Sequence, residues 1–255
     1  MAVAPGSILT WLAIREVLKK RNIKGSTLLD AGCGDAWMTK KLIRSGIIRG
    51  GIALEPSQHA HTRAQQQLAP YGGVIRCNQK ALNEFTTEEM FDVGCALMVI
   101  EHLEDDVGFV RRLSSNVRRG GWVLIAVPAG VNKWTYEDDL VGHLRRYNQN
   151  SLEKVMHEAG LLAELKIVEV GFPLLNLTER IRNWVLRRRH PLSMESLSLV
   201  ERTENSGVWN KRWINSFPGL GLFINGFTMY PFHLLQRALK ERDKSVVLMG
   251  IALKD

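Results

Sequence analysis

Short apolar runs of strand length alternate with helix-length segments through the first two thirds of the chain. This alternation is typical of βα units that build a mostly parallel sheet. Strands are expected at residues 27–30, 51–54, 74–77, 91–97, 122–127, 163–170 and 245–253. Helices are expected at residues 8–18, 36–45, 57–68, 105–118 and 150–159, the fourth of them ending at the glycine pair 120–121. The sequence therefore predicts an α/β fold.

Cysteine usage and the start of the chain exclude several protein classes. Cys33, Cys77 and Cys95 lie far apart without a C-x-x-C pair, which supports neither a disulfide framework nor a thiolate zinc site. The first expected helix already carries Arg15 and Lys19, unlike the apolar core of a signal peptide. We therefore expect a reducing, cytoplasmic location and no export.

A glycine turn follows the first expected strand, in the run Asp30-Ala31-Gly32-Cys33-Gly34. Glycines there allow the backbone to approach a ligand closely. A dinucleotide fingerprint would need a further glycine at Trp37, and no G-K-[ST] follows that would form a phosphate-binding loop. Glu55, at the end of the second strand, is placed to accept two hydrogen bonds from a ribose diol. A lone glutamate is more often a solvated surface charge, but its spacing after the turn favours a nucleoside site.

These residues resemble the class I S-adenosylmethionine-dependent methyltransferases, a group that includes quinone-biosynthesis and other small-molecule methylases. The matching segments are Asp30–Gly34, Glu55–Ser57, Phe91–Leu103 and Gly120–Leu124, which occur in the family's order between residues 27 and 171. The resemblance implies a Rossmann-like seven-stranded sheet of order 3-2-1-4-5-7-6, with the seventh strand antiparallel. It also implies S-adenosyl-L-methionine as the cofactor.

The resemblance implies a set of cofactor-binding residues. The aspartate and the glycine turn would meet the methionine part, and the glutamate would meet the ribose hydroxyls. Where the family often has an aspartate for the adenine amine, this sequence offers the amides of two adjacent residues, and the choice between them stays open. Ala36 replaces a common glycine, a change that the fold should tolerate. The expected set is Asp30, Gly32, Cys33, Gly34, Glu55, Pro56, Asn78, Gln79 and Leu97.

Two histidines are the candidate catalytic residues. An acceptor alcohol needs a positioned base, usually histidine near neutral pH, whereas an acidic phenol needs none. His102 follows the fourth strand, at the sheet edge where ligands bind in α/β folds, although it could equally bond only a loop. His143, in the string Gly142-His143-Leu144-Arg145-Arg146-Tyr147, is the best candidate base, and this string resembles a branch of these methyltransferases. We expect no metal site.

The loop after the fifth strand supplies the candidate acceptor-binding residues. Either of its two arginines could clamp an anionic part of the acceptor. The alternative is that the arginines pair with the neighbouring acids at 137–139 and hold the loop together. The candidates are Trp134, Tyr136, Arg145, Arg146 and Tyr147.

A long segment, residues 172–244, separates the last two strands and must carry structure of its own. It holds a net charge of +6 out of the chain's +8, with twelve Lys or Arg against six Asp or Glu. Residues 174–189 are expected to form a basic amphipathic helix. Residues 213–236 carry no charge and have spanning length, but their prolines and glycines argue against an uninterrupted membrane helix. A lid or interfacial element is expected, with core packing or a homodimer contact as the alternative.

We therefore divide the chain into a cofactor-binding methyltransferase domain, residues 1–171 and 245–255, and an inserted acceptor lid, residues 172–244. The predicted function is transfer of a methyl group to an oxygen atom of a hydrophobic small molecule that is anionic or lipid-linked. The protein is expected to make peripheral contact with the inner face of a membrane. The alternatives are a soluble aromatic or sugar-containing natural product as acceptor, and a catalytically silent nucleoside-binding subunit. Nucleic acid is disfavoured as acceptor, because no N-P-P-Y, D-P-P-Y or Pro-Cys motif is present.

Overall fold

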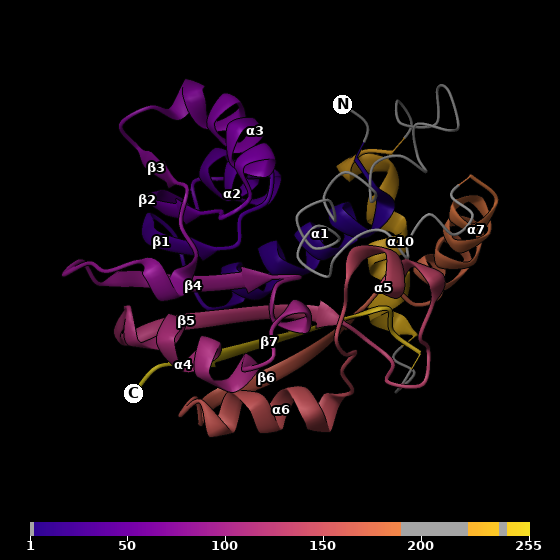
Figure 1. Ribbon diagram of the computed structural model, residues 1–255. Helices are drawn as coiled ribbons and strands as arrows, with labels where there is room; N and C mark the ends of the chain where they lie inside the picture. The colour runs from indigo at the N-terminus through magenta and orange to yellow at the C-terminus, as the bar shows by residue number, and fades with distance from the viewer. Residues whose placement is uncertain (1–2, 190–223, 240–243) are drawn as a thin grey trace.

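The computed structural model describes residues 3–189, 224–239 and 244–255. Within these residues the strands form one sheet of order 3-2-1-4-5-7-6, in which β7 runs antiparallel to both of its neighbours (Figure 1). The predicted α/β fold and strand order are confirmed. The strands are β1 (Ser26–Ala31), β2 (Ile48–Leu54), β3 (Ile75–Asn78), β4 (Phe91–Leu97), β5 (Val117–Pro128), β6 (Ala163–Val170) and β7 (Val247–Leu253).

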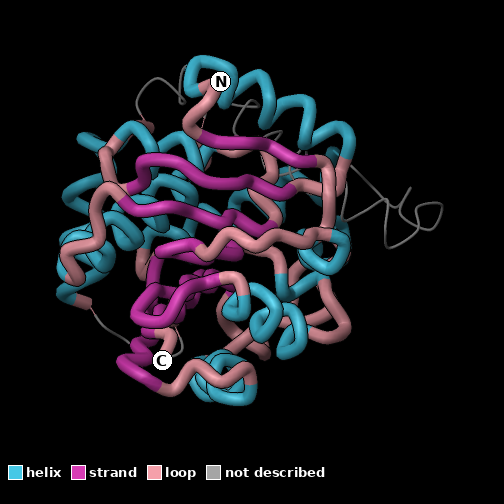
Figure 2. The backbone as a smooth tube through the Cα atoms, turned by 90° about the vertical axis from the view of Figure 1, so that its left-hand side faces the viewer, coloured by secondary structure: helices cyan, strands magenta, loops and turns pink. Residues whose placement is uncertain are grey.

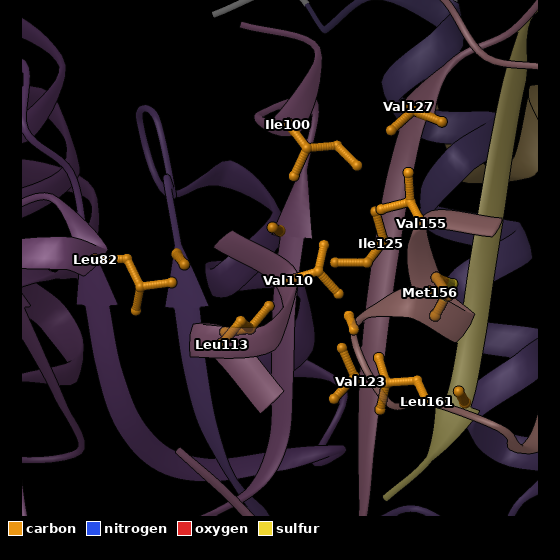
Figure 3. Packing of buried hydrophobic residues seen from close by; sticks show 14 of the residues in the cluster. Leu82, Ile100, Val110, Leu113, Val123, Ile125, Val127, Val155, Met156 and Leu161 are labelled. Atoms are coloured by element: carbon orange, nitrogen blue, oxygen red, sulfur yellow. The ribbon is translucent and has the colours of Figure 1, made fainter. Parts of the chain in front are cut away.

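Helices cover both faces of the sheet, and Figure 2 shows the strands as one twisted layer with helices around it. The cause is the two-residue period of each strand, which sends Leu28 and Leu29 into different cores. The core that contains Leu28 includes α1 and α2, whereas the core that contains Leu29 includes α4 and α6. Figure 3 shows Val110 of α4 beside Ile125 of β5 in this second core. The helices are α1 (Pro5–Lys20), α2 (Trp37–Arg44), α3 (Gln58–Leu68), α4 (Asp106–Ser115), α5 (Tyr136–Val141), α6 (Gln149–Glu158), α7 (Leu174–Arg189) and α10 (Gly226–Ala238).

Two predicted boundaries are wrong, and in both cases the strand continues through glycines. The helix expected at residues 105–118, with the glycine pair 120–121 as its stop signal, ends at Ser115, and both glycines belong to β5. A Cβ on Gly121 would lie 2.8 Å from the carbonyl oxygen of Asp92, so the close approach of β4 requires glycine there. Likewise β2 starts at Ile48 rather than at Gly51, where a Cβ would lie 2.0 Å from the carbonyl oxygen of Leu28. The polar loop after β5 also contains a short helix, α5, that was not predicted.

The described part of the insertion is helical, and α7 matches the predicted basic helix. Helix α10 packs on α1, where His233 Nε2 lies 3.0 Å from Glu16 Oε2. The Gln236 side chain also accepts a hydrogen bond of 2.8 Å from the Gly171 amide. Of the uncharged stretch predicted at residues 213–236, residues 213–223 lie outside the described residues. Among the helices that the structure describes, none is long and apolar enough to cross a bilayer.

The segments that carry the predicted site residues follow strands that end at the same edge of the sheet. The arrowheads of β4 and β5 point toward the side where α5, α7 and α10 lie (Figure 1). The parallel strands β1 and β2 end on the same edge, because β1 runs parallel to both β2 and β4. The turn after β1 and the loop after β4 are therefore neighbours, and β6, which like β5 runs antiparallel to β7, leads the insertion to the same edge of the sheet.

Asp92, at the opposite end of β4, links β4 to β1 and β5, and its substitution tests how much these links stabilise the sheet. Its carboxylate accepts hydrogen bonds from the Thr27 amide (2.7 Å), the Thr27 hydroxyl (3.1 Å) and Arg118 Nε (2.5 Å). These donors, set against burial, hold the pKa of Asp92 below its ordinary value. Asp92→Asn is expected to lower the free energy of unfolding at pH 7 by about 1–3 kcal/mol, measured by urea denaturation.

The pH dependence has a definite sign. A carboxylate whose pKa is lower in the folded state stabilises the fold above its unfolded-state pKa of about 4, and this contribution is lost as the pH falls below that value. The difference between wild type and Asp92→Asn should therefore shrink below about pH 4. The exposed Glu88→Gln is the control and should change stability by less than about 0.5 kcal/mol. An equal effect of both substitutions would contradict this account.

Candidate active site

The turn after β1 leaves backbone exposed toward the sheet edge. Gly32 and Gly34 have φ of +85° and +59°, a region that favours glycine. A Cβ on Gly32 would lie 2.6 Å from Val99, whereas a Cβ on Gly34 would meet nothing within 4 Å. The amides of Gly32 and Cys33 both donate to the Leu54 carbonyl at 2.9 Å. The turn is therefore fixed to β2 on one side and in contact with the segment after β4 on the other, with open space at Gly34.

Glu55 lies beside this turn, with a carboxylate that is held by backbone amides. Its Oε2 accepts from the Gly34 amide at 2.8 Å, and its Oε1 accepts from the Ser57 amide at 3.0 Å. Burial raises the pKa of Glu55, and these two amides act in the opposite direction. Each carboxylate oxygen keeps a further lone pair, so the group can still accept two hydrogen bonds from a vicinal diol.

The other predicted cofactor residues differ in accessibility. Asp30 is buried and accepts hydrogen bonds from the Thr39 hydroxyl and from Cys95 Sγ (3.3 Å), so its role toward the cofactor stays a prediction. The Asn78 carbonyl accepts from the Glu55 amide at 3.1 Å, which places the end of β3 beside the glutamate. Cys33, Asn78 and Leu97 are half-buried, and Pro56 and Gln79 are exposed.

Ala36, which replaces the family's usual glycine, starts α2 in the left-handed conformation with φ +58°. A non-glycine residue pays about 1–2 kcal/mol for this region, which explains why glycine is common there. The helix still begins at the next residue, as expected of a tolerated change.

The two candidate catalytic histidines come together at the ends of β4 and α5. The rings of His102 and His143 lie 4.8 Å apart between centroids, in an edge-to-face arrangement. Glu101, which was not selected from the sequence, completes the group, with its Oε1 3.9 Å from His143 Nε2. Its side chain is fully buried, and neither carboxylate oxygen has a hydrogen-bond partner. We call Glu101, His102 and His143 the strand-edge cluster.

Hydrogen bonds fix which ring nitrogen of each histidine is free. His143 Nδ1 lies 2.7 Å from Asp138 Oδ1, and His102 Nδ1 lies 3.1 Å from the Gly142 carbonyl oxygen. Because a carbonyl or an ionised carboxylate only accepts, each Nδ1 carries the proton. Each Nε2 of a neutral ring is therefore a lone pair, and that of His143 lies near the carboxylate of Glu101.

Burial and neighbouring charges shift the pKa values of the cluster in different directions. Burial raises the pKa of Glu101 to about 7. Burial and the adjacent His143 lower the pKa of His102 to about 4. Hydrogen bonds from His143 and Arg146, opposed by burial, hold the pKa of Asp138 far below its ordinary value. At neutral pH this site therefore has an ionised Asp138 and a neutral His102.

Arg146 and Tyr147 are bound within the protein. Arg146 is buried and contacts Asp138 Oδ1 (2.8 Å), Glu179 Oε1 (3.0 Å) and the Ala129 carbonyl (3.1 Å). The Tyr147 hydroxyl donates to Asp106 at 2.8 Å, and burial together with this bond raises the pKa of Tyr147. The contacts of Arg146 follow the alternative in which an arginine pairs with acids and holds the loop.

The remaining candidate acceptor-binding residues differ in their exposure to solvent. Arg145 is half-buried and pairs with Asp106 at 3.1 Å. Trp134 is 45% exposed, and its ring nitrogen donates to Asp139 at 2.8 Å. Tyr136 is half-buried beside the guanidinium of Arg187, which lies 5.9 Å from the ring centre. Their contact with an acceptor remains a prediction.

The first helix of the insertion is tied to this loop by buried charges. Besides the bond between Arg146 and Glu179, Arg182 forms an ion pair with the buried Glu137. Asn183 Oδ1 also accepts from the Glu137 amide at 3.1 Å. Helix α7 is thus fixed against α5, the helix that carries Asp138.

Comparison with known proteins assigns the family. The model of a family described as "Methyltransferase domain" matches residues 9–164, which is more than half of the chain. The chain belongs to the class I S-adenosylmethionine-dependent methyltransferases. The enzyme class and the cofactor expected from the sequence are thereby confirmed, in preference to a catalytically silent subunit.

Individual relatives are more distant. A ubiquinone biosynthesis O-methyltransferase from Azorhizobium caulinodans is 31% identical over 107 residues, which is 42% of each chain. The chain therefore matches less than half of the length of this relative. Among solved structures, a putative sarcosine dimethylglycine methyltransferase from Galdieria sulphuraria has a TM-score of 0.61 at 14% identity, over 97% of this chain and 85% of that one. The [4+2]-cyclase SpnF has a TM-score of 0.60 at 13% identity, over 95% and 80%. These likenesses show the fold, and the cyclase shows that the fold alone does not fix the reaction.

The described residues fit the cofactor. Gly34 offers open backbone without a Cβ, and Glu55 offers two further acceptor sites for a ribose diol. When bound, S-adenosylmethionine supplies an already activated methyl group. The protein has to orient an acceptor, exclude water and manage the acceptor's proton.

Glu55 provides the test of the cofactor site. Glu55→Ala should weaken binding of S-adenosylhomocysteine about ten- to a hundredfold in calorimetry, because two charged hydrogen bonds to the ribose are lost. The control is Glu89→Ala, an exposed glutamate of another loop, which should bind like wild type. Circular dichroism should show folded protein in both variants. Unchanged affinity in folded Glu55→Ala would refute the ribose role.

Proposed function

We propose that this chain transfers a methyl group from S-adenosylmethionine to an oxygen of a hydrophobic, lipid-linked small molecule. The observation that carries the proposal is the strand-edge cluster, in which a carboxylate and two imidazoles offer lone pairs. The cluster lies next to the turn at Gly32–Gly34 after β1, which we call the cofactor turn. Gly32 and Val99 bring the turn and the cluster together, because Val99 stands two residues before Glu101. Groups of this kind serve to withdraw a proton from a hydroxyl.

His143 is the residue proposed to act on the acceptor hydroxyl. Asp138 fixes the orientation of its ring through Nδ1, while Nε2 remains as the accepting atom. His102, whose pKa is lowered to about 4, stays neutral and lines the same site. The proposal agrees with the name of the curated relative, which is an O-methyltransferase of ubiquinone biosynthesis.

The insertion supports a hydrophobic acceptor. Helix α10 presents several large apolar side chains to solvent, and α7 adds exposed Leu177 and Trp184 together with arginines. We propose that α7 and α10 of the insertion belong to a lid over the acceptor and touch a membrane surface, since apolar and basic side chains together favour anionic lipid. The exposed apolar residues of α10 are Phe227, Tyr230, Phe232, Leu234 and Leu235.

Isotope transfer tests this function directly. Purified protein is incubated with methyl-labelled S-adenosylmethionine and a cell extract from its source, and the products are divided between organic and aqueous phases. We expect label in the organic phase. Aqueous label would contradict the lipid-linked acceptor and support a soluble aromatic or sugar-containing acceptor, and no transfer to any acceptor would contradict the proposed function.

Matched variants assign the residues in the same assay. His143→Ala should lower turnover about a hundredfold or more without changing cofactor affinity, whereas the exposed His157→Ala on α6 should behave like wild type. Phe227→Asp combined with Leu234→Asp should reduce organic-phase label several-fold, and Leu162→Asp, at an exposed site before β6, is its control. Equal organic-phase label with the double variant and with Leu162→Asp would contradict the proposed role of the lid.

A further inference from the structure

The carboxylate of Glu101 is an unusual group for a protein interior. The residue is 0% exposed, and no donor bonds either oxygen. Buried carboxylates are normally paired with a cation or supplied with hydrogen-bond donors, since burying one without compensation is costly. Glu101 therefore points to a positively charged partner that is not part of the described chain.

Its neighbours do not supply that charge. The two imidazoles hold their Nδ1 protons on Asp138 and on the Gly142 carbonyl, so both Nε2 atoms are lone pairs when the rings are neutral. Three hydrogen-bond acceptor groups thus lie together with no donor among them. Each of Glu101, His102 and His143 contributes one potential ligand atom, and these three atoms lie within 4.8 Å of one another.

The surroundings of the histidines match those of metal ligands. A ligating histidine usually donates its other ring nitrogen to a carboxylate or a carbonyl, which orients the ring and raises its basicity. His143 does so to Asp138 and His102 does so to Gly142. Asp138 is itself anchored by Arg146, so this outer support is rigid.

We propose that the strand-edge cluster binds one divalent first-row transition cation through Glu101, His102 and His143. Two imidazoles and one carboxylate suit Zn²⁺, Mn²⁺ or Fe²⁺, whereas Mg²⁺ prefers oxygen ligands alone. Metal–ligand distances of about 2.0–2.2 Å require the three side chains to close by about 1 Å. This site differs from the sequence-based expectation, which included no metal.

The inference rests on the proposed function and sharpens it. Three protein ligands leave at least one coordination position free, and the acceptor oxygen would occupy it. The cation lowers the pKa of the bound hydroxyl, so the O–H bond breaks, its electron pair stays on oxygen and the proton leaves to solvent. His143 then acts as a ligand rather than as a free base. Hydroxyls that chelate, such as vicinal diols or catechols, are the favoured acceptor class.

Binding of Mn²⁺ to the untagged full-length chain tests the site without any acceptor. Electron paramagnetic resonance reports the loss of the free Mn²⁺ signal, and we expect one bound ion per chain. Glu101→Gln should weaken binding at least tenfold, whereas Glu104→Gln, an exposed neighbour, should bind like wild type. Glu101→Gln should also fold, because it removes an unpaired buried charge. In thermal melts Mn²⁺ should raise the Tm of wild type but not that of Glu101→Gln.

Absence of stoichiometric Mn²⁺ binding, or equal binding by Glu101→Gln, would overturn the metal site. Methyl transfer that persists in the presence of a chelator would also overturn it while leaving the proposed function intact, with His143 as the base. Conversely, Mn²⁺ bound at Glu101 without any methyl transfer would uphold the metal site and refute the proposed function.

Discussion

The arrangement at the sheet edge depends on the carboxylate of Asp138. One of its oxygens accepts from both His143 and Arg146, and the other accepts from the amide and the hydroxyl of Thr135. Four donors keep this group ionised, and an ionised Asp138 in turn fixes the tautomer of His143. Through Arg146 and Glu179 the same carboxylate anchors α7. The orientation of His143 therefore depends on this carboxylate, which also contributes to the docking of α7 beside the ion pair of Arg182 with Glu137.

The parallel sheet accounts for the meeting of two chemically different sites. Neighbouring β1 and β4 end at the same edge, so the glycine turn after β1 touches Val99 after β4. The cofactor side is built from backbone amides and Glu55, which suit a neutral diol. The proposed acceptor side offers lone pairs that suit a proton or a cation. Such a division would let the fold keep one cofactor while the acceptor changes, because the residues proposed for the acceptor lie in loops.

Local patterns in the sequence were sufficient for the number and order of the strands and for the glycine turn after β1, but not for the starts of β2 and β5, which lie before or among glycines. Glu55 and the glycines have fixed spacing, and His102 and His143 each stand in a short motif. The partnership between these histidines depends on the left-handed turn at Gly142, which no local pattern specifies.

Glu101 was missed for a related reason. A glutamate at a strand end usually faces water, and its burial here follows from the Gly142–Tyr147 loop, where the Leu144 amide bonds the Glu101 carbonyl. The adjacency of Glu101 to His102 was the available signal. For Arg146 the sequence left two roles open, and its pair with Asp138 is the one in which an arginine binds the neighbouring acids. Its second partner, Glu179, comes from the insertion, so no local pattern indicated it.

In the proposed reaction, the glycine turn after β1 and the strand-edge cluster face one reaction centre. A crystal structure of the protein with S-adenosylhomocysteine tests it most directly. We expect both ribose hydroxyls within hydrogen-bond distance of Glu55, with the sulfur atom directed toward Glu101, His102 and His143. A cofactor whose sulfur points away from these three residues would contradict it.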